Sequence, residues 1–302
     1  MDMGTQTNDI GKQHTDWATC KALETLHDET EGQILRAVVV AAHPDDEVIG
    51  LGSLLPRLHR ASFIYTTDGA PRDQEDAVRS GFDSRDAYRD ARRRELTHAF
   101  AFAGITKPKI KTLPFVDKES SLNLVRLTRA LAREFARAQP ALIFTHAYEG
   151  GHPDHDATAF AVYHALRLCE RLYESENIRH ESPVLIEYTS YHEHENKFRG
   201  GAFLPPAGAI KEHELCLNLS TAAREFKRNL FRCFASQDYV LDHFSVETEC
   251  FRCAPTYDFS QPPHAGRLHY ETFGWGWTGA KWRSLAHNAL AELSKQDERL
   301  SF

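Results

Sequence analysis

Short apolar runs alternate with amphipathic stretches along most of the chain. Residues 37–42 (Ala-Val-Val-Val-Ala-Ala) are continuously apolar and β-branched at their centre, which is typical of a strand buried on both faces of a parallel sheet. Similar runs predict further strands at 63–66, 110–113, 141–144, 184–191 and 215–219. Amphipathic stretches predict helices at 47–60, 84–104, 122–138, 156–174, 221–234 and 280–293.

The order of these elements indicates the fold class. Strands that alternate with helices form βαβ units, so we expect an α/β fold with a mostly parallel sheet and helices on both faces. Residues 68–84 are expected to form a long loop. Residues 1–30 are expected to be a polar lead-in with one helix near 17–26, and residues 31–302 a single domain. Within it, residues 240–302 form an irregular, aromatic-rich C-terminal extension packed on the rest.

A cluster of ionisable residues, His43-Pro44-Asp45-Asp46-Glu47, follows the first predicted strand. In open parallel sheets, ligands bind beyond the carboxyl ends of the strands. His43 and Asp46 are three residues apart, so imidazole and carboxylate can converge on one ion, and this ligation suits zinc and similar divalent metals. Asp45 could then face the open position and take a proton from metal-bound water. The alternative is a capped helix start with Asp45 or Asp46 as the N-cap.

A second cluster, His152-Pro153-Asp154-His155, follows the predicted strand 141–144 and therefore has the same topological position. The preceding Gly150 and Gly151 permit a sharp turn or a close backbone approach. His152 and His155 are three residues apart at a helix start, so both can face one cavity. The alternative is a pair of exposed histidines that cap a helix.

The two clusters together indicate one catalytic metal site. An ion held by His43, Asp46 and one histidine of the second cluster would have three protein ligands and an open position, as catalytic zinc does. The other histidine would be available as a general acid or an oxyanion donor. A nearby aspartate, Asp154 or Asp156, could orient an imidazole.

On these residues the chain resembles the LmbE / PIG-L family of zinc-dependent N-deacetylases. The specific motifs are Ala42-His43-Pro44-Asp45-Asp46-Glu47 and His152-Pro153-Asp154-His155. Weaker likenesses, spread over residues 34–240, are Thr67-Asp68-Gly69, Arg92-Arg93-Arg94-Glu95 with Ala99 and Gly104, Leu113-Pro114 with Asp117, and Lys227 with Ser236-Gln237. The resemblance implies a Rossmann-like fold and hydrolysis of an N-acyl group, usually the N-acetyl group of a glucosamine unit.

The resemblance also implies roles for individual residues. The ligands of Zn²⁺ would be His43, Asp46 and His155. Asp45 would be the general base, and His152 would stabilise the oxyanion or protonate the leaving amine. Contacts to the substrate are implied for Arg92 and Asp117. Tyr148 is a further candidate for a substrate contact, and Asp154 is expected to support the ligands. Fe²⁺, Co²⁺ and Mn²⁺ stay open as the native metal, because availability decides as much as geometry.

Composition and charge exclude several function classes. The chain of 302 residues has 36 Lys and Arg against 43 Asp and Glu, a formal charge of −7, which argues against a general binder of nucleic acid or anionic membranes. No apolar run approaches the roughly 18 residues of a membrane span, and the N-terminus lacks the apolar region of a secretory signal. With only six Cys, a reduced, cytoplasmic chain is expected. The 17 His are unusually many.

Other motifs carry weaker signals. No Gly-rich phosphate loop follows the first strand, and no Gly-x-Ser-x-Gly occurs, which argues against a dinucleotide site and a serine nucleophile. Residues 191–195 are interpreted as a solvated, charged loop, with a second metal site or a substrate wall as alternatives. Cys250 and Cys253 are interpreted as ordinary thiols. Residues 274–277 (Gly-Trp-Gly-Trp) are expected to pack under the tail, with a substrate cleft or a subunit contact as alternatives.

We therefore expect a metal-dependent hydrolase that removes an N-acetyl or other N-acyl group from a small-molecule amino sugar or its conjugate. One alternative is an amidase that acts on a non-sugar N-acyl or thiol-conjugate substrate. Another is a non-catalytic carbohydrate-binding relative. Asp45 and His152 argue against the latter, because a binder needs neither a base nor an acid. The acyl length, the acceptor and the oligomeric state, a homo-oligomer being one option, stay open.

Overall fold

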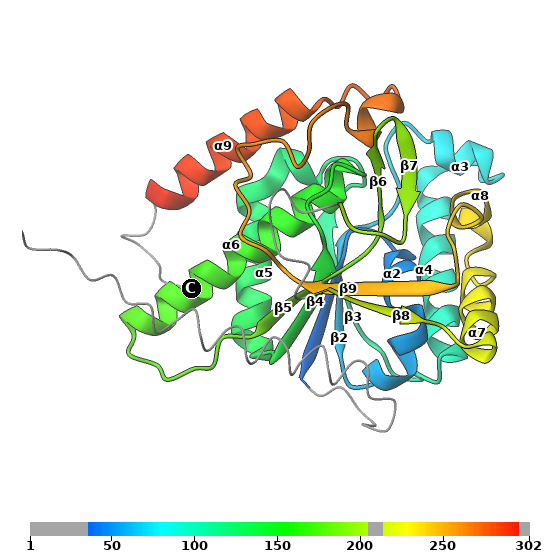
Figure 1. Ribbon diagram of the computed structural model, residues 1–302, viewed down its shortest axis with the longest axis horizontal. Coiled ribbons are helices and arrows are strands. Elements are labelled where there is room, and N and C mark those ends of the chain that lie inside the picture. The colour runs from blue at the N-terminus through cyan, green and yellow to red at the C-terminus, as the bar shows by residue number, and fades with distance from the viewer. Residues whose placement is uncertain (1–35, 205–213, 296–302) are drawn as a thin grey trace, which may run out of the picture.

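The computed structural model describes residues 36–204 and 214–295. A central sheet runs through the molecule, and helices cover both of its faces (Figure 1). The strands follow one another across the sheet in the order β3-β2-β1-β4-β5-β9-β8. The helix expected near residues 17–26 lies outside the described residues.

The sheet is mostly parallel, as expected. Its parallel strands are β1 (Ala37–Ala41), β2 (Ser62–Thr67), β3 (Lys109–Phe115), β4 (Leu142–His146) and β5 (Val184–Tyr188). Antiparallel strands form the edge beyond β5: β9 (Thr248–Cys253) and β8 (Glu214–Asn218). The α/β fold class predicted from the alternating pattern is therefore confirmed.

The helices flank the sheet, with α5 and α6 on one face and α2, α4 and α7 on the other (Figure 1). The bounds of the α-helices are α2 (Asp46–Leu51), α3 (Glu75–Arg79), α4 (Arg85–Phe102), α5 (Leu124–Ala138), α6 (Pro153–Ser175), α7 (Thr221–Phe231), α8 (Asp238–Leu241) and α9 (Gly279–Lys295). Short 3-10 helices are η1 (Gly52–Leu58), η2 (Ser120–Asn123), η3 (Ala235–Gln237) and η4 (His269–Thr272). A separate hairpin consists of β6 (Tyr191–His194) and β7 (Lys197–Gly200).

Strand β1 shows why both faces of the sheet need helices. Val39 packs into the core that includes residues of α4 and α7, whereas Val38 and Val40 pack into the core that includes residues of α5 and α6. Successive side chains of a strand point to opposite faces, so an entirely apolar strand is stable only when both faces are covered. The carboxyl end of β1 then leads directly into the first ionisable cluster.

Several predicted elements differ from the observed ones. The helix expected at 47–60 is a short α-helix followed by the 3-10 helix that contains Pro56, which has no N–H to continue an α-helical ladder. The loop expected at 68–84 contains α3. The strand expected at 184–191 ends at Tyr188, and Tyr191 begins the separate hairpin. Strand β9 was not predicted, because its sequence Thr-Glu-Cys-Phe-Arg-Cys is neither a continuous apolar run nor a regular alternation.

A disulfide between Cys216 and Cys250 links β8 to β9. The expectation of a reduced chain, in which Cys250 is an ordinary thiol, is therefore wrong. The antiparallel register sets these two residues directly opposite each other, with their Cα atoms 4.1 Å apart. The sequence could not indicate this pair, because β9 itself was not predicted and the two cysteines are 34 residues apart.

The segment after β9 crosses the α5–α6 face and ends in α9 (Figure 1). Trp282 of α9 is fully buried, and its indole Nε1 donates a hydrogen bond to the Pro153 carbonyl at the start of α6. This segment therefore packs against the helix that begins at the second ionisable cluster. Among the helices within 36–204 and 214–295, none combines the length and the apolar character that a membrane crossing requires.

Candidate active site and metal centre

The first cluster forms a closed turn between β1 and α2. The His43 N–H donates a hydrogen bond to Asp46 Oδ2 at 2.7 Å, and the Asp46 N–H returns to the His43 carbonyl at 3.3 Å. The same Asp46 oxygen lies 3.4 Å from His43 Nδ1. Backbone and side chain together therefore hold these two potential ligands side by side.

Asp45 has a strained backbone within this turn. Its φ of 126° lies in a region that residues other than glycine rarely adopt, and such strain costs about 1–3 kcal/mol. The Asp45 N–H donates to Glu47 Oε2 at 3.1 Å, and Arg92 Nη2 donates to Asp45 Oδ2 at 2.8 Å. Burial raises the pKa of the Asp45 carboxyl to about 7, although Arg92 opposes that shift. Strain maintained at a buried carboxylate is a sign of a functional residue.

The second cluster begins helix α6. His152 is the N-cap, and its Nδ1 accepts a hydrogen bond from the Asp154 N–H at 3.1 Å, so that the proton of the neutral ring lies on Nε2. Burial lowers the pKa of His152 well below its usual value, and the neighbouring His43 and His155 lower it further. His152 is therefore a neutral hydrogen-bond donor.

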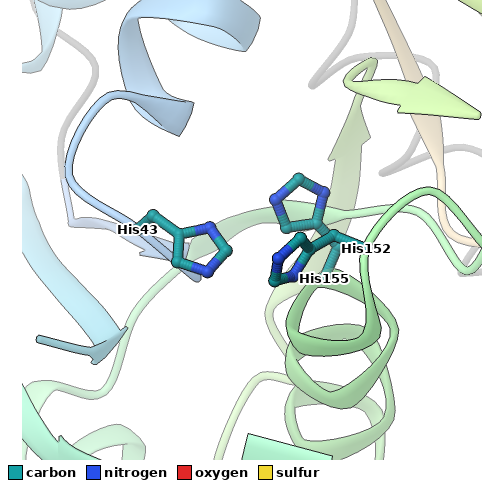
Figure 2. Close-up of side chains that lie close together, drawn as sticks. All are labelled: His43, His152 and His155. Atoms are coloured by element: carbon teal, nitrogen blue, oxygen red, sulfur yellow. The ribbon is translucent and has the colours of Figure 1, made fainter. Parts of the chain in front are cut away.

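The fold brings the two clusters together. His155 Nε2 lies 3.1 Å from Asp46 Oδ1, and the His43 ring centroid is 4.6 Å from that of His152 and 5.3 Å from that of His155. In Figure 2 the His43 ring extends from the loop after β1 toward the rings of His152 and His155, which come from the start of α6. The three ligands implied by the resemblance are thus neighbours, with Asp46 in contact with both His43 and His155.

His146, at the end of β4, was given no role from the sequence. It is fully buried, and its Nε2 lies 3.2 Å from Asp46 Oδ2 and accepts a hydrogen bond from the Ala42 N–H at 3.0 Å. Its ring stacks on His155 with the centroids 4.0 Å apart. Its position at the carboxyl end of a predicted strand could have indicated that His146 belongs to the site, because β4 pairs with β1.

The donor atoms fit a divalent cation such as zinc. Nitrogen atoms of His43, His152 and His155 lie within 4.8 Å of one another, and so do donor atoms of Asp46, His146 and His155. Imidazole nitrogens and carboxylate oxygens are the ligand types that zinc takes. Burial disfavours the Asp46 carboxylate, yet His155 and His146 outweigh that effect and hold its pKa well below the usual range. The charged form of Asp46 is therefore available to bind a cation.

The residues expected to support the site or contact the substrate have different positions. Asp117 Oδ1 and Asp154 Oδ2 lie 3.1 and 3.4 Å from His43 Nε2. Arg92 is buried and donates hydrogen bonds to Asp45 and to the backbone carbonyls of Pro44 and Gly69. Few of its N–H groups therefore remain for a substrate. Tyr148 is not brought to the site. Its ring packs between Phe259 and Trp282 of the C-terminal segment.

The clusters open into a cavity of about 590 Å³. Its lining includes Asp45, Asp117 and His152 together with Tyr191 and Trp275, which lie far along the chain. The interpretation of residues 191–195 as a solvated loop is wrong, because this segment forms β6 and His192 is buried against Glu149. Of the two tryptophans in 274–277, Trp275 lines the cavity and Trp277 is buried, so the expected packing holds for one of them.

Comparisons with known proteins agree with this description. Residues 38–166 match the family described as PIG-L: GlcNAc-PI de-N-acetylase. No curated protein matches the chain. Several solved structures share the fold. The N,N'-diacetylchitobiose deacetylase from Pyrococcus horikoshii has 17% identity and a TM-score of 0.53, over 83% of this chain and 95% of that chain.

Two further structures are similar in fold. The A40926 pseudoaglycone deacetylase has 18% identity and a TM-score of 0.52, over 74% of this chain and 98% of that chain. A deacetylase of the teicoplanin pathway, in complex with teicoplanin, has 17% identity and a TM-score of 0.52, over 74% of this chain and all of that chain. Both ionisable clusters lie within the matched residues. Over residues 38–166 the chain is therefore similar to the PIG-L family, whose model is described as a de-N-acetylase.

Proposed function

We propose that this protein is a metal-dependent hydrolase that removes an N-acetyl or other N-acyl group from an amino sugar or its conjugate. The observation that carries the proposal is the convergence of Asp45 and His152 on one cavity beside the buried donors of His43, Asp46 and His155. The family match supports the proposal, because the description of that family names a de-N-acetylase. The names of the similar structures also describe deacetylases.

The metal would be held by His43, Asp46 and His155. When bound, a divalent ion such as Zn²⁺ supplies Lewis acidity that polarises the amide carbonyl and lowers the pKa of water. The chain itself orients these ligands. The Asp154 carboxylate forms a hydrogen bond with His43 Nε2, and His146 Nε2 lies next to the Asp46 carboxylate. Such supporting contacts commonly change metal affinity or activity about 10- to 100-fold.

Asp45 acts as the general base in this proposal. Its carboxylate takes a proton from the attacking water as the water oxygen bonds to the amide carbonyl carbon. Arg92 holds one carboxylate oxygen at 2.8 Å, and the strained backbone directs the side chain into the cavity. The base is therefore oriented before the substrate binds.

His152 stabilises the developing charge. Because its Nδ1 accepts the Asp154 N–H, its Nε2–H is free to donate to the carbonyl oxygen as that oxygen becomes negative. The C–N bond then breaks, and the leaving nitrogen takes the proton that Asp45 received. The products are a carboxylic acid, acetate for an N-acetyl substrate, and a free amine.

Acetate release from a panel of N-acetylated amino sugars, measured with and without a chelator, tests this function. We expect release that stops with the chelator and returns on addition of Zn²⁺. Release that is insensitive to chelation would contradict the metal dependence. A protein that binds the metal yet releases no acyl group from sugar and non-sugar amides would contradict the hydrolytic function.

A further inference from the structure

A chain of aromatic contacts surrounds one side of the cavity. Starting from His155, successive ring centroids lie 5.3 Å apart to Tyr191, 5.6 Å on to His269 and 4.7 Å on to Phe273. From Phe273 the next ring, Trp275, is 4.4 Å away, and Trp275 is 5.2 Å from His152. Because His152 and His155 also contact each other at 5.3 Å, the contacts close into a ring.

Two more rings broaden this surface. Phe198 contacts Tyr191 and His269, and Phe244 contacts Tyr191 and Phe198. We call the following set the aromatic wall: Tyr191, Phe198, Phe244, His269, Phe273 and Trp275. All of its members line the cavity, and all lie outside residues 38–166, the segment that carries the family motifs.

The aromatic wall is fixed to the catalytic loop through its two glycines. A Cβ atom on Gly151 would lie 1.9 Å from the Tyr191 carbonyl oxygen, so only glycine permits this approach. Gly150 has a φ of +71°, and its carbonyl accepts a hydrogen bond from the His269 N–H at 2.9 Å. These glycines were expected to allow a close backbone approach, and the segments that approach are the ones that carry the aromatic wall.

Lys118 holds the other end of the wall. Its ammonium lies 4.3 Å above the Trp275 ring, and its carbonyl accepts a hydrogen bond from the Trp277 indole at 3.1 Å. Lys118 directly follows Asp117, which contacts His43. The wall is therefore held in place relative to the catalytic groups at both ends, and a preorganised surface binds with a smaller entropic cost.

The exposed members of the wall indicate a ligand surface. Phe198 and Phe273 keep 42% and 38% of their area exposed. Single exposed apolar residues are common, but rings gathered at the mouth of a cavity are typical of a binding site. Neither side chain has a polar group, so both favour an apolar partner. The two lie at the outer part of the wall, each one ring beyond the residue that contacts a catalytic histidine.

A polar part of the lining adjoins the aromatic wall. It includes Glu75, Asp76 and Arg79 of α3 together with Tyr239, whose hydroxyl donates to Asp76 Oδ1 at 2.9 Å. Asp76 Oδ2 lies 3.5 Å from the Lys118 ammonium that covers Trp275. A ligand that suits both sides has a polar part and a neutral, flat, apolar part.

We propose that the aromatic wall binds a neutral aryl group carried by the substrate, so that this protein prefers aryl-bearing N-acylated amino sugars over the plain N-acylated sugar. The inference rests on the proposed function, because it places the scissile amide at Asp45 and His152. The sugar then lies toward the polar side, and the aryl aglycone reaches Phe198 and Phe273.

The test compares three compounds on the full-length protein: N-acetyl-D-glucosamine, its phenyl β-glycoside and N,N'-diacetylchitobiose. Isothermal titration calorimetry measures binding, and acetate release measures turnover. We expect the phenyl glycoside to bind and react roughly 5-fold or more better than the plain sugar, which is the effect of one or two well-formed aromatic contacts. The disaccharide should gain less, because its second unit is polar.

Variants assign the preference to the wall. Phe273→Ala and Phe198→Ala should each lower the ratio of phenyl glycoside to plain sugar by about 3-fold or more, and Phe273→Tyr should retain it. Phe102→Ala is the matched control. Phe102 is 44% exposed and stacks on Phe226 at 5.3 Å, but it does not line the cavity. This control should leave both the ratio and the melting temperature close to wild type.

The outcomes separate this inference from the proposed function. A phenyl preference in binding that depends on Phe273, without acetate release from any compound, would support the aromatic wall and contradict the hydrolase. Acetate release with equal affinity for all three compounds would overturn the aromatic wall and leave the hydrolase standing. A gain for the disaccharide equal to that for the phenyl glycoside, lost in the same variants, would identify a sugar subsite and overturn the aryl assignment.

Discussion

The two sides of the cavity are built in opposite ways. The side that we propose to be catalytic consists of ionisable groups that are almost fully buried, such as Asp46, which has short polar contacts with His43, His146 and His155. The aromatic wall consists of neutral rings that pack on one another and leave Phe198 and Phe273 partly exposed. Buried charges need defined partners, whereas apolar contacts are not directional. Catalysis and selectivity can therefore be altered separately.

The two sides also differ in their origin along the chain. The catalytic side comes from two short loops within residues 38–166, the segment that matches the PIG-L family model. The aromatic wall comes from β6, β7, the turn after α8 and the segment around η4. Substitutions in the loops should abolish the reaction for every substrate, whereas substitutions in the wall should change which substrate is preferred. The following predictions test that division, in order of decreasing effect.

Loss of a metal ligand should have the largest effect. His155→Ala should lose the bound metal and lower kcat/KM by at least about 10³-fold for plain and aryl-bearing substrates alike, because metal assistance contributes several kcal/mol. Elemental analysis of the purified protein and acetate release check this. Full metal content in the variant would show that other donors, such as His146, suffice.

Removal of the base should separate chemistry from metal binding. Asp45→Asn should keep the metal and lower kcat by about 10²- to 10⁴-fold, the usual contribution of general base catalysis. The ratio between phenyl glycoside and plain sugar should not change, since Asp45 touches neither the aglycone nor the wall. Equal loss of metal in Asp45→Asn and His155→Ala would contradict the assignment of Asp45 as base.

Arg92 should affect the reaction through Asp45. Arg92→Met leaves a buried carboxylate without its partner, so we expect a loss in kcat of roughly 10- to 100-fold and a destabilisation of about 3–5 kcal/mol. Chemical unfolding and steady-state kinetics measure the two effects. Arg93→Met, at an exposed position of the same helix, is the control and should change neither. A rise in KM with kcat unchanged would instead favour the substrate contact that the family resemblance implies.

Gly151 tests the connection between the two sides. Gly151→Ala forces a Cβ atom against the Tyr191 carbonyl and should destabilise the protein by about 1–3 kcal/mol, as overpacking does. The displaced Tyr191 should also reduce the phenyl preference about 2- to 5-fold. Gly81→Ala is the comparison for stability loss alone: its φ of +76° disfavours a Cβ, but an added Cβ meets no atom within 4 Å, so it should cost stability and leave the phenyl preference unchanged. An unchanged preference in Gly151→Ala would mean that the wall does not depend on this approach.

The smallest effect concerns the scaffold behind both sides. Burial lowers the pKa of His164 on α6 to about 4, and Arg167 and Arg171 contribute in the same direction. Because the unfolded chain binds this proton more tightly, the stability that the neutral ring provides is complete above pH 6.5 and is lost as the pH falls through about 4. His164→Phe should remove about 1–3 kcal/mol of this acid sensitivity. Urea unfolding at pH 7 and pH 4.5 measures this effect. An equal decrease in the free energy of unfolding between the two pH values for wild type and variant would contradict the prediction.

The two ionisable loops could be predicted because their signals are local. The run 37–42 is too apolar for anything but a buried strand, and ionisable residues at the carboxyl end of such a strand have few uses other than ligand binding. The helix predicted at 84–104 was equally local: the observed α4 follows the N-cap Ser84 and ends shortly before Gly104, which has a φ of +81°. Local signals therefore gave the parallel core and the potential ligands.

The features that were missed depend on contacts between distant segments. His146 became part of the site only because β4 lies beside β1, which brings Asp46 and His155 to it. Cys216 and Cys250 pair because β8 and β9 are antiparallel neighbours, and β9 itself gave no clear pattern. Tyr148 was expected to contact the substrate, yet its ring packs against Phe259 and Trp282 of the C-terminal segment.

The sequence by itself determined the parallel sheet, the two ionisable loops and the chemistry that those loops can perform, since each depends on residues close together in the chain. Only the tertiary structure decided that the loops meet, that His146 joins them and that an aromatic wall closes the cavity. The physical reason lies in the kind of interaction. A buried charge or a strand leaves a recognisable local pattern, whereas an aromatic side chain has the same appearance in the sequence whether it fills a core or faces a ligand.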